Sequence, residues 1–117
     1  MSDRREQRMD LMLPVRISGL DANGCLFEQE AETLDVTTTG ARLSKVRHSL
    51  HRGCILSVQR GASKARFRVM WIGEDRGPDE GQIGLQLVER GKLIWGQVIP
   101  RIFGDRFRGI DREQLPR

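Results

Sequence analysis

Residues 65–72 read ARFRVMWI, and the alternation of apolar and charged side chains in this stretch is typical of a β-strand. Phe67, Val69 and Trp71 fall on one face of the strand, and Arg66 and Arg68 fall on the other. A strand with one apolar and one charged face packs against a core on one side and meets solvent on the other, as strands of antiparallel sheets do. The stretch therefore predicts a half-buried antiparallel strand.

Shorter stretches of similar character lie on both sides of this strand. They occupy residues 11–18, 25–36, 41–44, 54–59 and 82–88, and turn-forming residues such as Asn23-Gly24 and Gly61 separate them. Residues 92–102 could form one short helix interrupted by Pro100. About six short antiparallel strands at hairpin spacing predict an all-β fold, either a small closed barrel or a sandwich, with a short C-terminal helix.

Length and composition limit the classes of protein that this chain can belong to. With 117 residues, it has room for one core. Its apolar runs are only a few residues long, so we expect no membrane contact, no signal peptide and a cytoplasmic location. The formal net charge is +4, and 17 of the 20 basic residues are arginine, whose planar fork suits phosphate groups. Only particular arginines can carry a functional argument, since a bias in codon usage also explains such an excess.

Signatures of catalysis or metal binding are poor. His48 and His51 lack the glutamate of an H-E-x-x-H motif, and we expect both to face solvent. Cys25 and Cys54 are too far apart in sequence for a C-x-x-C signature. The chain has no nucleophile-elbow sequence and no phosphate-binding P-loop sequence. We therefore expect no catalytic residues, no metal site and no cofactor.

Two short motifs stand at defined places relative to the predicted strands. Arg4 and Arg8 form R-x-x-x-R directly ahead of the first strand, although this spacing means little alone because Arg108 and Arg112 repeat it. Residues 35–40, DVTTTG, form D-x-T-x-x-G at a junction where one strand turns into the next. An ordinary turn is a second interpretation of this motif, compatible with a functional one, with the aspartate as a local backbone acceptor and the glycine supplying an unusual backbone angle.

Taken in order, these features resemble the PilZ domain family. Its members carry R-x-x-x-R just before the first barrel strand and a D/N-x-S-x-x-G motif about two strands later. Two later landmarks also fit, the segments 70–73 (MWIG) and 83–87 (IGLQL). The resemblance covers roughly residues 4–88. It implies a flexible basic arm over residues 1–10, a six-stranded antiparallel β-barrel over 11–90, and a short helix with a charged tail over 91–117.

The resemblance also implies a ligand, the bacterial second messenger cyclic di-GMP. Arg4 and Arg8, with Arg5 assisting, would grip its phosphate oxygens and stack on guanine. Asp35 would accept hydrogen bonds from the guanine edge. Thr37 would offer a hydroxyl where the family has serine, and Gly40 would let the backbone approach the ligand without a Cβ clash.

Three functions remain open from these observations. The first is a cyclic di-GMP sensor that signals to an unidentified downstream protein when the ligand orders the N-terminal arm. The second is a ligand-free PilZ-like module that docks another protein, with Trp95 and Phe103 as possible anchors. The third is a small nucleic-acid-binding barrel. We expect no specific nucleic-acid binding, because the chain has no Tyr and only 4 Phe for base stacking.

Overall fold

A computed structural model describes residues 8–89 together with Ile94 and Trp95. The described residues form an all-β fold, as the alternating sequence predicts, and contain no helix. The expected C-terminal helix and tail lie outside the described residues, apart from Ile94 and Trp95. The strands are β1 (Met9–Asp10), β2 (Pro14–Leu20), β3 (Leu26–Val36), β4 (Gly40–Ser44), β5 (Ile55–Arg60), β6 (Ser63–Ile72) and β7 (Ile83–Leu87).

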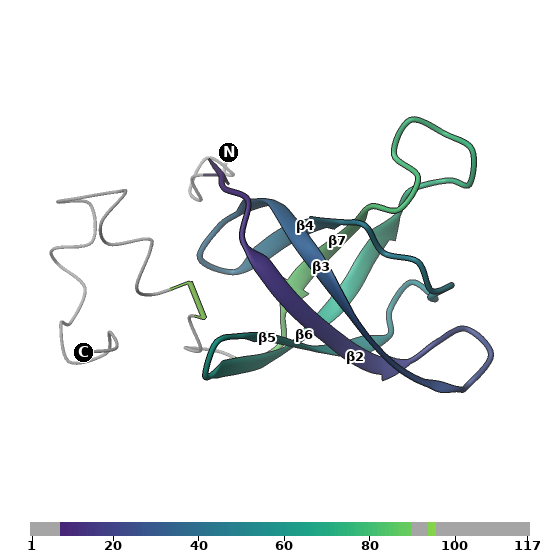
Figure 1. Ribbon diagram of the computed structural model, residues 1–117, viewed down its shortest axis with the longest axis horizontal. Coiled ribbons are helices and arrows are strands. Elements are labelled where there is room, and N and C mark those ends of the chain that lie inside the picture. The colour runs from purple at the N-terminus through teal and green to yellow at the C-terminus, as the bar shows by residue number, and fades with distance from the viewer. Residues whose placement is uncertain (1–7, 90–93, 96–117) are drawn as a thin grey trace, which may run out of the picture.

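Strands β2 to β7 close into an antiparallel barrel. Following the hydrogen-bonded neighbours leads from β3 through β2, β5, β6, β7 and β4, and the pairing of β4 with β3 completes the ring (Figure 1). A closed ring leaves no strand edge exposed, which is the usual way in which a small all-β protein avoids edge-to-edge aggregation. The expected six-stranded antiparallel barrel is confirmed, and the sandwich is excluded.

The two residues of β1 extend the wall of this ring. Met9 pairs with Val36 and Asp10 pairs with Asp35, so β1 continues along β3 beyond the stretch that β2 covers. These residues end the segment that we expected to be a flexible arm. Thr33 ties the connection between β1 and β2 to the barrel, because its Oγ1 accepts from the Leu13 amide at 2.8 Å and donates to the Leu11 carbonyl. The N-terminal segment therefore joins the barrel at the C-terminal end of β3.

Apolar side chains fill the inside of the barrel. Phe67 and Val69 point inward from β6, as the alternation predicts, and they are almost fully buried. Trp95 is also 1% exposed, and its ring centroid lies 6.3 Å from that of Phe67. The expectation that Trp95 anchors a partner protein is wrong, since the core already uses this side chain. Phe103 lies outside the described residues.

The polar connection after β4 is held by a buried glutamine. The Gln29 amide donates to the Lys45 carbonyl at 2.9 Å and accepts from the Arg47 backbone amide at 2.8 Å. His48 stacks on Phe27 with ring centroids 4.5 Å apart. The expectation that His48 faces solvent is therefore wrong, because the glutamine folds this connection back onto the barrel, whereas His51 is exposed as expected.

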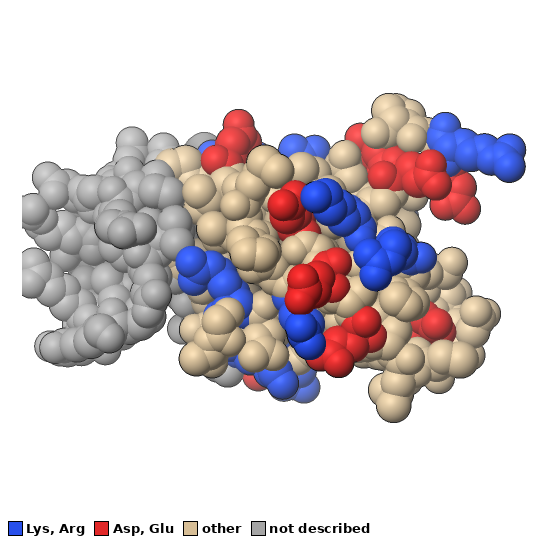
Figure 2. Space-filling model, viewed as in Figure 1, with Lys and Arg blue, Asp and Glu red and all other residues tan. Residues whose placement is uncertain are grey.

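Charged side chains of both signs are spread over the visible outer face. Figure 2 shows acidic and basic residues interleaved there, without one continuous positive surface among the described residues on this face. On β2 and β3, Arg16 lies between Glu28 and Glu30 at 3.2 and 2.9 Å. The hydrogen bonds that Arg16 donates to Glu28 and Glu30 raise the pKa of its exposed guanidinium above the usual value. Over the described residues, no helix is long and apolar enough to cross a membrane.

Candidate ligand-binding site

A pocket of about 250 Å³ lies on the outside of the barrel, beside the turn that joins β3 to β4. Its walls come from the end of β3, from β4, β6 and β7, from the turn itself, and from Arg8 at the end of the N-terminal segment. Residues from both predicted motifs therefore reach one place. These segments are distant in sequence and meet because β1 and β4 lie on opposite sides of β3.

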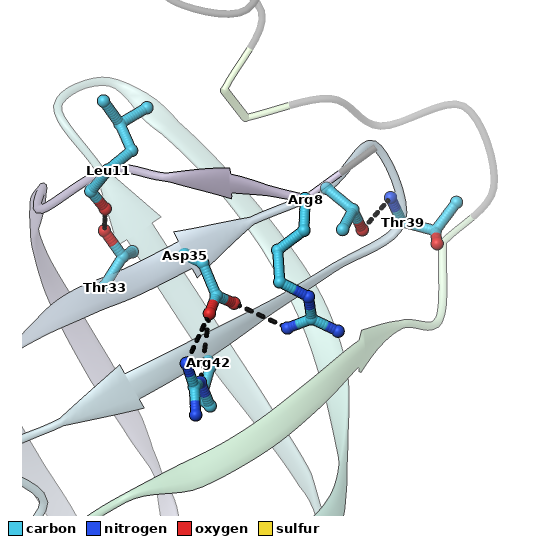
Figure 3. A network of polar contacts seen from close by, with 7 residues as sticks. Arg8, Leu11, Thr33, Asp35, Thr39 and Arg42 are labelled. Atoms are coloured by element: carbon cyan, nitrogen blue, oxygen red, sulfur yellow. Dashed lines mark hydrogen bonds and ion pairs between the residues drawn. The ribbon is translucent and has the colours of Figure 1, made fainter. Parts of the chain in front are cut away.

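Asp35 is the centre of the polar contacts at this pocket. Its Oδ1 accepts a hydrogen bond from Arg8 Nη1 at 2.8 Å. Its Oδ2 accepts two bonds from Arg42, one from Nε at 3.0 Å and one from Nη2 at 2.7 Å. Figure 3 shows one guanidinium group at each of the two carboxylate oxygens. The aspartate thus links the N-terminal segment to β4 rather than capping its own turn.

The burial of these three side chains is uneven. The Asp35 side chain is 1% exposed, whereas those of Arg8 and Arg42 are 60% and 38% exposed. A buried carboxylate without partners is strongly unfavourable, so the two arginines stabilise it. Two positive groups around one negative group leave a net positive charge at the mouth of the pocket. Such a site favours an anionic ligand.

Sequence interpretation missed Arg42, although the hairpin contains a signal for it. In a hairpin, residues equidistant from the turn lie opposite one another. The turn at residues 37–40 therefore places Val36 opposite Ala41 and Asp35 opposite Arg42, which is the register observed. A carboxylate and a guanidinium facing each other across two strands form a favourable cross-strand pair.

Two strand irregularities lie beside the pocket. The pairing of β3 with β4 shifts register between Thr33 and Asp35, and the pairing of β6 with β7 shifts between Val69 and Trp71. Bulges of this kind change the direction of side chains and are common beside functional sites. Here the shift between β6 and β7 places Trp71 opposite Gly84, and the shift between β3 and β4 lies directly beside Asp35; Asp35, Trp71 and Gly84 all line the pocket.

Thr37 and Gly40 shape the turn between β3 and β4. The Thr37 amide donates to the Gly40 carbonyl at 2.9 Å, and Thr37 Oγ1 accepts from the Thr39 amide at 3.2 Å. A Cβ on Gly40 would lie 2.6 Å from the Leu85 carbonyl oxygen. The absence of a side chain at Gly40 therefore serves the close approach of β4 to β7, in addition to any role near a ligand.

Comparison with known proteins relates the barrel to one solved structure. No family model and no curated protein matches the sequence. The structure is similar to the PilZ domain of CeSA from a cellulose synthesizing bacterium, with a TM-score of 0.54 and 17% sequence identity, over 86% of this chain and 98% of that chain. The chain has the PilZ-domain fold.

Within this PilZ-type barrel, four of the six residues that we expected at the site lie together. Arg8, Asp35, Thr37 and Gly40 all line the pocket. Arg4 and Arg5 lie outside the described residues, as do Arg108 and Arg112 of the second R-x-x-x-R sequence. The described residues contain no cluster of His, Cys, Asp and Glu that could hold a metal ion.

Proposed function

We propose that this protein binds cyclic di-GMP at the pocket beside the β3–β4 turn and acts as a sensor domain rather than as an enzyme. One observation carries the proposal: Arg8 of the R-x-x-x-R motif and Asp35 of the D-x-T-x-x-G motif, 27 positions apart, are joined at 2.8 Å in this pocket. Chance arginine spacing does not explain why these two motifs meet. The PilZ-domain fold adds support, since the resemblance that led to these residues also implies this ligand.

The chemistry of the pocket suits a cyclic dinucleotide with two phosphates. The exposed guanidinium of Arg8 can donate to phosphate oxygens, and its plane can stack on a guanine ring. Arginine also recognises the O6 and N7 acceptors of guanine, where adenine presents a donor at N6. The pocket volume of about 250 Å³ falls just below the usual range of roughly 300–1,000 Å³ for small-molecule sites. We therefore expect the pocket to hold part of the ligand, and Arg4 and Arg5 to contact the remainder.

Signalling would follow from these additional contacts. Arg8 already lies against the barrel through Asp35, and β1 fixes the two residues after it. A ligand held by Arg4, Arg5 and Arg8 would extend this contact toward the N-terminus and so change the surface that the protein presents. An unidentified downstream protein, in the cytoplasm of a bacterial cell, would read that change.

A second candidate function is a ligand-free protein-interaction module. It is favoured by the finding that Arg8 and Arg42 already engage both Asp35 oxygens, so that the motif has a structural role without ligand. In that case the arginines and Asp35 hold the N-terminal segment to the barrel permanently, and the partner recognises the surface that results.

Titration calorimetry with the full chain separates these two functions. We expect cyclic di-GMP to bind with a dissociation constant in the micromolar range or below, which corresponds to about 8 kcal/mol or more. Linear GMP and cyclic di-AMP should bind much more weakly. GMP has only one nucleotide, and adenine has an N6 donor where guanine has the O6 acceptor. The absence of heat with cyclic di-GMP would reject the sensor function and favour the ligand-free module.

A further inference from the structure

Arg42 holds Asp35 more firmly than Arg8 does. It donates from both Nε and Nη2 to one carboxylate oxygen, whereas Arg8 donates from Nη1 alone. Arg42 lies on β4 within the closed barrel, and its side chain is only 38% exposed. Its position is therefore set by the barrel. A guanidinium that is held in place loses less conformational freedom when it binds a ligand than a freely moving one does.

Arg42 also keeps hydrogen-bonding capacity beyond its contact with Asp35. A guanidinium has five N–H groups, and the two bonds from Nε and Nη2 to Asp35 leave both N–H groups of Nη1 and one of Nη2. Arg42 lines the pocket beside Arg8 and Gln86. Asp35 itself offers little to a ligand. Its side chain is only 1% exposed, and both of its oxygens already accept hydrogen bonds from arginine.

We propose that Arg42 is a further ligand-binding arginine, which donates to a phosphate of the bound dinucleotide, and that Asp35 is a positioning residue that acts through Arg8 and Arg42. This inference rests on the proposed function. It replaces the expectation that Asp35 accepts hydrogen bonds from guanine, because the carboxylate is buried and both of its oxygens are already paired. The positive charge left over at the two arginines is the feature that attracts the phosphate.

Calorimetry on a matched set of variants tests the role of Arg42. Arg42→Ala should lower the affinity for cyclic di-GMP at least tenfold, and Arg42→Lys should retain part of it, because lysine keeps the charge but loses the fork. The control is Arg16→Ala. Arg16 also bridges carboxylates from a barrel strand, but it lies away from the pocket, so its loss should change affinity less than twofold. Equal losses for Arg42→Ala and Arg16→Ala would overturn the role of Arg42.

A double-mutant cycle tests the role of Asp35. If Asp35 acts through the arginines, Asp35→Asn should weaken binding in the wild-type background and much less in the Arg42→Ala background. A direct contact between Asp35 and guanine would instead give independent effects that multiply. A purely structural role would lower the melting temperature of Asp35→Asn and leave the affinity of the folded protein unchanged. Either of these two results would overturn the positioning role.

A second probe separates failure of this inference from failure of the proposed function. If the wild type binds cyclic di-GMP and Arg42→Ala binds equally well, the inference fails and the sensor function stands. If cyclic di-GMP gives no heat, the sensor function fails, and inorganic pyrophosphate then tests the arginines by NMR of their guanidinium N–H groups. A saturable shift of the Arg42 resonance that is lost in Asp35→Asn would retain the anion site. The absence of any shift would reject the anion site as well.

Discussion

The guanidinium of Arg8 donates a hydrogen bond to the buried carboxylate of Asp35 at 2.8 Å, and this contact joins the N-terminal segment to the barrel. Arg8 is 60% exposed and Asp35 is 1% exposed, so one partner faces solvent at the pocket while the other is buried. The contact therefore contributes to stability and also places a cation at the pocket. These two consequences can be tested separately.

Arg8→Ala should lower stability without any ligand. The variant removes one charge-assisted hydrogen bond from a buried carboxylate, and we expect a loss of about 1 kcal/mol, because Arg8 is exposed and Arg42 keeps its own bonds. For a domain of this size, the melting temperature should fall by roughly 4–8 °C. Thermal denaturation followed by circular dichroism measures this change. An unchanged melting temperature would show that Arg8 does not hold the N-terminal segment in solution.

Removing the two arginines that contact Asp35 should lower the stability of the protein more than removing Asp35 itself. Removing both Arg8 and Arg42 leaves a buried carboxylate unpaired, and we expect the double alanine variant to lose about 3–5 kcal/mol. Asp35→Ala leaves two partly exposed guanidiniums that water can solvate, and it should cost only about 1–2 kcal/mol. Urea denaturation of both variants measures the difference. Equal losses would show that the burial of Asp35 is not what makes the network important.

Gly40→Ala should destabilise the barrel by about 1–3 kcal/mol, because the added Cβ would lie 2.6 Å from the Leu85 carbonyl oxygen and would force β4 away from β7. Thermal denaturation without ligand measures this loss. A variant that melts like the wild type but no longer binds cyclic di-GMP would indicate that the glycine serves the ligand and not the fold.

Thr33→Val should loosen the connection between β1 and β2. Valine preserves the shape of threonine but cannot bond to the Leu13 amide or the Leu11 carbonyl, and we expect a loss of about 1–2 kcal/mol. Hydrogen exchange at the Leu13 amide should become faster. Thr38→Val, in the partly exposed turn, serves as the control and should change stability by less than about 0.5 kcal/mol. Unchanged exchange at Leu13 would contradict this role of Thr33.

Binding to duplex DNA should be weak and sensitive to salt. Acidic and basic side chains alternate over the face shown in Figure 2, so a DNA backbone would meet few uninterrupted positive groups there. Any retention at low salt should disappear near physiological ionic strength, as for contacts to phosphates alone. Gel-shift titrations at two salt concentrations test this. A sequence-selective complex that survives at the higher concentration would make nucleic acid a partner.

The strands were predictable from the sequence because the signals for them are local. The period-two alternation of residues 65–72 identifies β6, and the Thr37–Gly40 turn by its symmetry also indicates the pairing of Asp35 with Arg42. The sequence did not show that Trp95 completes the core. One tryptophan outside any alternating pattern can equally well face solvent or the interior, and only the space beside Phe67 decides between them.

By itself the sequence determined a small all-β protein with two motifs in order, because alternation and turn chemistry depend on residues that are near one another in the chain. Only the tertiary structure decided that Arg8 meets Asp35. That contact requires β1 to continue along β3 and a register shift beside Asp35, so that three segments converge on one carboxylate. Burial of that carboxylate is a property of the closed barrel, and burial is what makes its two arginines necessary partners.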